Sequence, residues 1–127
     1  MRVVFIVIAV VWGLSYFYRL NAQVKFNRLN VEEFQKAIAK DGVQVLDVRT
    51  DQEYKNGHIA SAINMDVLSN ITFKQQIEAL DKTKPLYVYC RSGKRSLMAL
   101  RILQKKGFVS IWDLKGGYQE WEKTHKN

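Results

Sequence analysis

Short apolar runs alternate with amphipathic helical segments from residue 24 onward, and this alternation limits the folds open to the chain. The apolar runs are four to six residues long or shorter and are bounded by turn-forming residues, which is typical of buried strands. Four segments have this composition: 43–48, 63–65 (the weakest), 86–89 and 109–112. Repeated strand–helix alternation predicts an α/β fold with a mostly parallel sheet that helices cover on both faces.

The segments between these runs carry apolar residues at helical spacing. Asn30 is a candidate N-cap with Glu33 in the capping-box position, and Gly42 is a candidate stop for that helix. In a second helix, Phe73, Ile77 and Leu80 recur at i, i+4 and i+7. Further helices are expected at 51–54 with Asp51 as the cap, at 96–106 with Leu97, Leu100, Ile102 and Leu103 facing inward, and at 118–123.

The first 22 residues differ in composition from the rest. Arg2 precedes an almost unbroken apolar run at 3–14, and Ala22 precedes Gln23, which is typical of a secretory signal peptide. An uncleaved membrane anchor and a buried core helix are the alternatives, although the apolar stretch is shorter than the roughly 20 residues that span a bilayer. We therefore expect a targeting or anchor segment at 1–22, a domain at 23–127, and an exported, periplasmic or membrane-anchored protein rather than a cytoplasmic one.

Charge and cysteine content narrow the function. The net charge of +8 is spread along the chain without a run of five basic residues, which favours small anions over nucleic acid as partners. A single cysteine excludes an intramolecular disulfide and a second thiol within the chain. A chain of 127 residues has room for one core, and we expect a monomer without metal or organic cofactor.

That cysteine begins the most informative motif of the chain. It follows the strand candidate at 86–89 and precedes a helix, and such a joint aims several backbone N–H groups at one point. Three cations in the same turn favour thiolate over thiol. A small buried core cysteine is the alternative. The motif consists of Cys90, Arg91, Ser92, Gly93, Lys94 and Arg95.

Three stretches resemble the signatures of rhodanese-like domains, in order and at familiar spacing over residues 24–123. They are Leu46-Asp47-Val48-Arg49 with Glu53, Gly57-His58-Ile59 and Ala62-Ile63-Asn64; Val88 to Ser96; and Leu114 to Trp121. The resemblance implies one rhodanese domain with a five-stranded, mostly parallel sheet flanked by helices. It also implies sulfurtransferase activity through a persulfide on the cysteine.

The resemblance implies the roles of individual residues as well. Cys90 attacks the outer sulfur of an anionic donor such as thiosulfate, while the backbone N–H groups of 91–95 hold the donor. Arg95 is the best candidate for direct contact with the anion. The sulfur then passes to cyanide, a small thiol or a protein thiol. Asp47 and Arg49 border the pocket or support its loops, and His58 bonds to backbone.

Other functions compete with this interpretation. Related cysteine phosphatases and arsenate reductases place one residue more between Cys and Arg than the four that separate Cys90 from Arg95 here. The shorter loop makes a tighter ring of amides, which favours sulfur over a tetrahedral oxyanion. A persulfide carrier without turnover, or a protein-binding module, is the remaining alternative.

Overall fold

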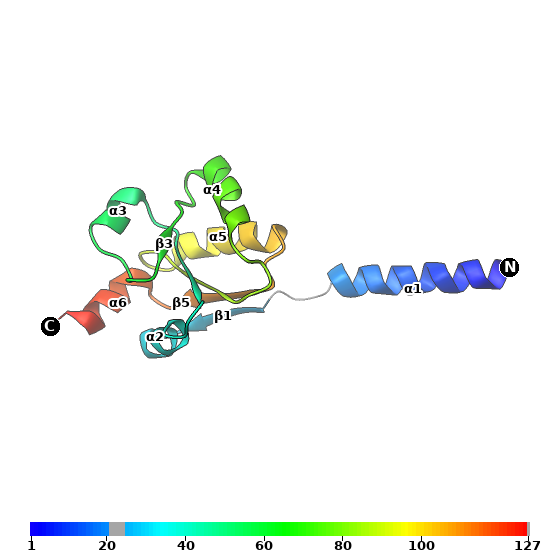
Figure 1. Cartoon of the computed structure of the whole chain (residues 1–127), viewed down its shortest axis with the longest axis horizontal. Coiled ribbons are helices and arrows are strands. Elements are labelled where there is room, and N and C mark those ends of the chain that lie inside the picture. The colour runs from blue at the N-terminus through cyan, green and yellow to red at the C-terminus, as the bar shows by residue number, and fades with distance from the viewer. Residues whose placement is uncertain (21–24, 127) are drawn as a thin grey trace.

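The computed structural model describes residues 1–20 and 25–126. In this part of the chain five strands form one sheet in the order β1-β5-β4-β2-β3, and every pair is parallel (Figure 1). The strands are β1 (Lys25–Leu29), β2 (Gln44–Asp47), β3 (Ile63–Asn64), β4 (Leu86–Tyr89) and β5 (Ser110–Leu114). The helices are α1 (Arg2–Leu20), α2 (Val31–Ile38), α3 (Asp51–Lys55), α4 (Asn70–Gln76), α5 (Lys94–Lys105) and α6 (Gly117–His125), with a 3-10 turn at Ile77–Ala79. The predicted α/β fold with a five-stranded parallel sheet is confirmed.

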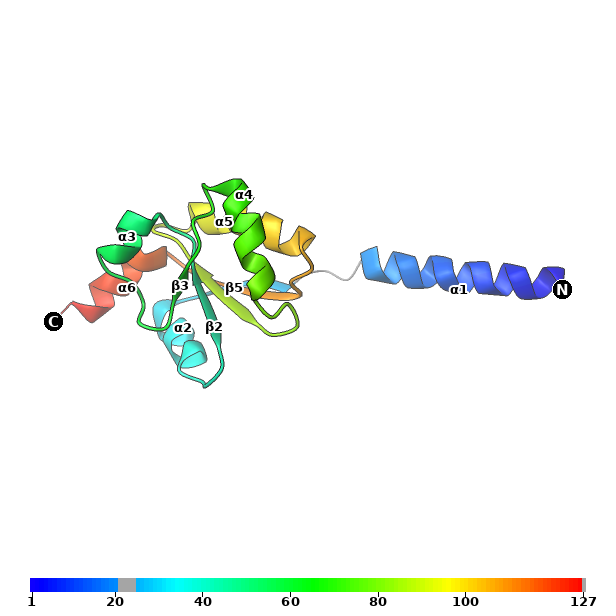
Figure 2. The same ribbon diagram turned by 45° about the horizontal axis from the view of Figure 1, so that its top comes forward.

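The core has two parts, one on each face of the sheet, because successive strand residues point to opposite sides. Leu46 and Val48 pack with α4 and α5, whereas Val45 packs with α2 and α6. Figures 1 and 2 show these two helix pairs on opposite sides of the sheet. The order places β4 at the centre of the sheet, so the loop after it lies where the carboxyl ends of parallel strands meet.

Two helix caps were predicted, and one of them is confirmed. Asn30 Oδ1 accepts the N–H of Glu33 at 2.9 Å, and Asn30 Nδ2 donates to the Glu33 carboxylate at 3.1 Å. The prediction for α3 was wrong by one residue, because Thr50 Oγ1 accepts the N–H of Glu53 at 3.3 Å. Asp51 is the first helical residue instead and pairs with Lys55.

Other elements also differ from the predictions. The helix α2 ends at Ile38 with Ala39 as its C-cap, so Gly42 lies in the following turn and is not the stop of this helix. Phe73 and Ile77 are buried as expected, but α4 ends at Gln76 and Leu80 is extended after the 3-10 turn. The last strand covers Ser110–Leu114 rather than 109–112, because it pairs with β1 as far as Leu114. The strand β1 was not predicted, because its sequence KFNRL is polar and it lies at the edge of the sheet.

The inward face of α5 was also predicted incorrectly at one position. Ser96, Ala99, Leu100 and Leu103 are its buried residues, which follow the i, i+3, i+4, i+7 pattern of one helix face. Leu97 lies one residue off this stripe and is 38% exposed.

The N-terminal segment forms the helix α1. All of its large apolar side chains between residues 3 and 18 are exposed, so the alternative of a buried core helix is wrong. Among the helices that the structure describes, we find none with both the length and the apolar character needed to cross a membrane. The expected boundary between residues 22 and 23 lies outside the described residues and stays a prediction.

Candidate active site

Cys90 follows β4 directly and is 1% exposed. Its Sγ accepts the backbone N–H of Gly93 at 3.0 Å, and the thiol donates to Ser96 Oγ at 3.7 Å. The tight turn depends on glycine, because Gly93 has φ of 103°, in the left-handed region. The thiol is therefore buried, as the core alternative expects, and its sulfur is also held by an amide of the loop, as a reactive site requires.

The start of the loop is fixed from outside by α6. Tyr118 N–H donates to the carbonyl of Cys90 at 2.8 Å, and Gln119 N–H donates to that of Arg91 at 3.1 Å. In a planar trans peptide the carbonyl and the following N–H point in opposite directions. The N–H groups of Arg91 and Ser92 therefore face away from α6. The Gly93 amide, in contrast, points at the Cys90 sulfur.

Gly117 makes this contact between α6 and the loop possible. A Cβ at this position would come within 2.5 Å of the carbonyl oxygens of both Cys90 and Arg91. Its φ of +63° is also unfavourable for residues with a side chain. Gly117, in the stretch from Leu114 to Trp121, thus allows α6 to contact the loop that begins at Cys90.

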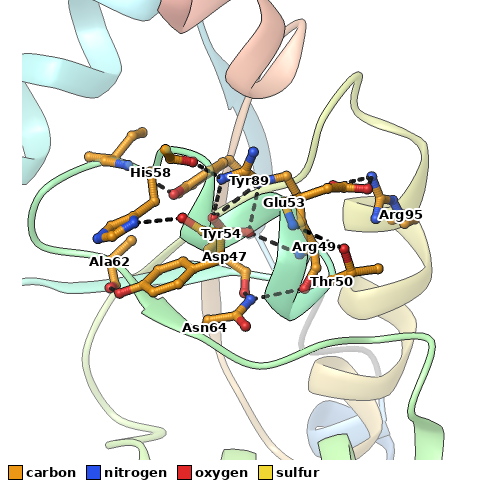
Figure 3. Close-up of polar contacts among 12 residues, drawn as sticks. Asp47, Arg49, Thr50, Glu53, Tyr54, His58, Ala62, Asn64, Tyr89 and Arg95 are labelled. Carbon is orange, nitrogen blue, oxygen red and sulfur yellow. Dashed lines mark hydrogen bonds and ion pairs between the residues drawn. The ribbon is translucent and has the colours of Figure 1, made fainter.

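Arg95 pairs with a carboxylate in this structure, and its expected contact with a donor anion stays a prediction. Its Nη2 donates to both carboxylate oxygens of Glu53, at 2.8 and 3.1 Å (Figure 3). Both side chains are partly buried, so the carboxylate on α3 already neutralises this cation at the start of α5. The exposed cations of the loop are Arg91 and Lys94.

Asp47 and Arg49 form a buried ion pair at the end of β2. Arg49 Nη2 lies 2.7 Å from Asp47 Oδ2 and donates to the carbonyl of Gly57, also at 2.7 Å (Figure 3). Its guanidinium lies over the ring of Tyr118, 4.2 Å from the centroid. Burial works against the charged guanidinium, but hydrogen bonding and attraction to Asp47 outweigh burial and raise the pKa of Arg49. The pair connects three parts of the chain: the strand β2, the helix α6 and the segment that follows α3. These contacts hold loops together, as we expected for Asp47 and Arg49.

Arg49 also borders a hollow beside the loop that Cys90 does not line, whereas Asp47 is fully buried and does not line it. The hollow has a volume of about 200 Å³ and opens between α3 and α6. Charged groups of both signs line it, together with amides and one aromatic ring. Its lining residues are Arg49, Glu53, Asn56, Arg91, Tyr118, Gln119 and Glu122.

His58 lies away from the loop and binds backbone, as expected. Its Nδ1 is 2.8 Å from the carbonyl oxygen of Tyr54, and its ring stacks on the Tyr54 ring at 3.7 Å. Among the described residues, we find no group of three His, Cys, Asp or Glu side chains that could hold a metal ion.

Two charged residues behind the loop were missed by sequence reasoning. Arg28 Nε on β1 lies 3.2 Å from Asp113 Oδ2 on β5, and Arg28 Nη2 donates to the carbonyl of Gly93 at 3.4 Å. A signal was present in the sequence. Asp113 lies two residues after the apolar Ile111, so the period of a strand places both side chains on the same, buried face.

Comparisons with known proteins agree with the architecture. Residues 30–124 match the family described as "Rhodanese-like domain". The "Uncharacterized protein YqhL" of Bacillus subtilis is 37% identical over 107 residues, covering 84% of this chain and 79% of YqhL. Thiosulfate sulfurtransferase GlpE of Shewanella oneidensis is 31% identical over 100 residues, covering 79% of this chain and 96% of GlpE. The crystal structure of a rhodanese-related protein from Thermoplasma volcanium has a TM-score of 0.65 at 32% identity, covering 80% of this chain and 95% of that one.

Proposed function

The chain belongs to the rhodanese-like domain family, and from this membership we propose that it is a sulfurtransferase acting through a persulfide on Cys90. The donor is thiosulfate or a persulfide, and the acceptor is a thiol or cyanide. The observation that carries the proposal is the hydrogen bond from the Gly93 N–H to the Cys90 sulfur, in a loop whose first two carbonyls are held by α6.

Sulfur transfer from thiosulfate needs no outside oxidant. The Cys90 thiolate attacks the outer sulfur, a new S–S bond forms, and the S–S bond of the donor breaks as sulfite leaves with the electron pair. An acceptor thiolate or cyanide then attacks the outer sulfur of the persulfide, and the Cys90 thiolate leaves. The loop amides favour both steps, because each one places negative charge on sulfur or on the departing anion.

The exposed cations of the loop add to this arrangement. Arg91 and Lys94 raise the local concentration of an anionic donor, while the charge of Arg95 is used by Glu53. Binding of the donor thus relies on backbone N–H groups and long-range attraction rather than on an arginine clamp.

The test is thiocyanate formation by the full chain from thiosulfate and cyanide. We expect turnover with the wild type and none with Cys90→Ser, which keeps the size of the side chain and its hydrogen bond from Gly93 but lacks the nucleophilic sulfur. Equal turnover in the two proteins would exclude Cys90 as the sulfur carrier. The phosphatase alternative is tested in the same way, and inertness of the chain toward aryl phosphates would exclude it.

A second candidate function is a persulfide carrier that does not turn over. The burial of Cys90 favours it, because a sulfur that is 1% exposed meets acceptors slowly. Mass spectrometry of the purified chain separates the two: a carrier retains the mass of one extra sulfur atom in the presence of cyanide, whereas an efficient transferase loses it.

We also propose that residues 1–22 direct the chain to export or hold it at a membrane surface. The exposed apolar side chains of α1 support this placement, because that much uncovered apolar surface calls for a lipid or protein environment. N-terminal sequencing of the mature protein, with cell fractionation, tests it. An intact N-terminus on a chain found only in the soluble fraction would contradict it.

A further inference from the structure

Asp113 is a buried carboxylate that ordinary stability does not explain. The residue is 1% exposed, and no hydrogen bond of good geometry reaches either of its oxygens from the residues that the structure describes, although the Ser96 hydroxyl and the Leu114 N–H lie near enough to favour the charged carboxylate. Among the described residues its ion-pair partner is Arg28, whose Nε lies 3.2 Å from Asp113 Oδ2. A carboxylate buried with so little compensation weakens a fold. A use in positioning would account for it.

Arg28 connects this carboxylate to the active-site loop. One guanidinium places Nε beside Asp113 and Nη2 3.4 Å from the carbonyl oxygen of Gly93. The two contacts join β1, β5 and the loop, although Arg28 and Gly93 are 65 residues apart in the sequence. The Arg28 side chain is 41% exposed, so without Asp113 it would have the freedom of a surface arginine.

Gly93 is the residue of the loop that touches the sulfur. Its N–H donates to Cys90 Sγ at 3.0 Å, and its carbonyl accepts from Ser96 Oγ at 3.1 Å as well as from Arg28. Fixing this carbonyl from outside turns the following N–H, that of Lys94, to the opposite side of the peptide plane. Arg28 therefore does for the end of the loop what α6 does for its start.

We propose that Arg28 and Asp113 are positioning residues for sulfur transfer: Asp113 orients Arg28, and Arg28 holds the carbonyl of Gly93, the residue whose own N–H contacts the Cys90 sulfur. The inference rests on the proposed sulfurtransferase function. Neither residue touches the donor, so both act through the loop.

The test compares Asp113→Asn, Arg28→Met and Arg28→Lys in the full chain. Arg28→Lys keeps the positive charge but has one nitrogen, so it cannot reach Asp113 and Gly93 together. We expect all three to lower kcat by about tenfold to a hundredfold, with KM for thiosulfate changed far less. The double variant Asp113→Asn/Arg28→Met should be no slower than the worse single variant, because the two residues act as one unit. Lys36→Met, which breaks the exposed pair with Glu32, is the control.

A second readout keeps this inference separate from the proposed function. The rate at which iodoacetamide alkylates Cys90 is measured against pH in each protein. This rate reports how the loop affects the reactivity of the Cys90 sulfur in the absence of any donor. We expect the profile to shift in the three variants and to stay in place in Lys36→Met. A wild type without turnover overturns the proposed function. In that case a shifted alkylation profile in the variants still supports the role of Arg28 and Asp113, and an unchanged profile overturns it. Variants with both the profile and the kcat of the wild type overturn the pair, and so does an equal loss in the control.

Discussion

Tyr118 donates its backbone N–H to the carbonyl oxygen of Cys90 at 2.8 Å, so the last helix of the domain fixes the first peptide of the candidate active-site loop. The contact requires Gly117 to lie against that loop, with no room for a side chain. Activity at Cys90 should therefore depend on a residue 27 positions away that never meets the donor.

Gly117→Ala tests this dependence. Its Cβ would collide with the carbonyls of Cys90 and Arg91, so we expect the loop to shift and kcat to fall by about a hundredfold. The matched control is Gly42→Ala, because Gly42 also has a positive φ, +74°, but has nothing within 4 Å of an added Cβ. Both variants should lose about 1 kcal/mol of stability or more through backbone strain. An activity loss of equal size in the two would contradict the role of the close contact.

The pair between Glu53 and Arg95 leads to a prediction about donor binding. Glu53→Gln removes the charge that neutralises Arg95, so the freed guanidinium should attract the anionic donor and lower KM for thiosulfate. Stability should fall by about 1 kcal/mol, since the pair is partly buried. Glu32→Gln, in the exposed pair with Lys36, is the control and should change neither. A KM that rises in Glu53→Gln would show that the pair itself shapes the donor site.

The sequence alone predicts the parts of this site that are local. The run at 86–89 and the motif after it place Cys90 at the end of a strand. Gly93 marks the turn after Cys90, and Gly116 and Gly117 mark the turn before the last helix. The contacts that fix the loop are not local. Glu53 and Arg95 are 42 residues apart, and Arg28 and Gly93 are 65 apart. Their meeting depends on strand order and register, which no short pattern specifies.

The same limit applies to elements of the fold. The strand β1 has a polar sequence and lies at the edge of the sheet, so its sequence lacks a clear apolar pattern and did not single out Arg28. Leu97 was placed inward because it is apolar, although the stripe that packs on the sheet runs through Ser96 and Ala99. The burial of Ser96 could be predicted only from its contact with Cys90, which the sequence pattern does not reveal.

The pKa of Asp113 gives a prediction about stability and pH. Burial raises it to about 6, against the partial opposition of the Ser96 hydroxyl and the Arg28 guanidinium. Between about pH 4 and 6 the native chain thus holds a proton that the unfolded chain has released. Stability should therefore fall as pH rises through this window and then stay lower, by about 3 kcal/mol at most from this residue.

Urea unfolding of wild type and Asp113→Asn at pH 4.5 and 7.5 measures this effect. The variant should gain stability relative to wild type at the higher pH while losing sulfur transfer. The exposed Glu78 and Asp81 have pKa values lowered by hydrogen bonds from Lys82 and Thr83, which favours stability at higher pH in both proteins. The difference between the proteins isolates Asp113, and a difference that does not change with pH would contradict the raised pKa.

Arg49 separates support from catalysis. Its guanidinium binds Asp47 through Nε and Nη2, reaches the carbonyl of Gly57 and lies over the Tyr118 ring, and the single nitrogen of a lysine cannot reproduce this bidentate, stacked arrangement. We expect Arg49→Lys to cost about 3 kcal/mol of stability, because it leaves a buried carboxylate poorly paired. Well below its melting temperature the variant should keep kcat within a fewfold of wild type, since Arg49 makes no contact with Cys90. Thermal unfolding and turnover at two temperatures measure both effects, with the exposed Arg101→Lys as the control. A variant of native stability with a hundredfold lower kcat would instead place Arg49 among the groups that meet the donor.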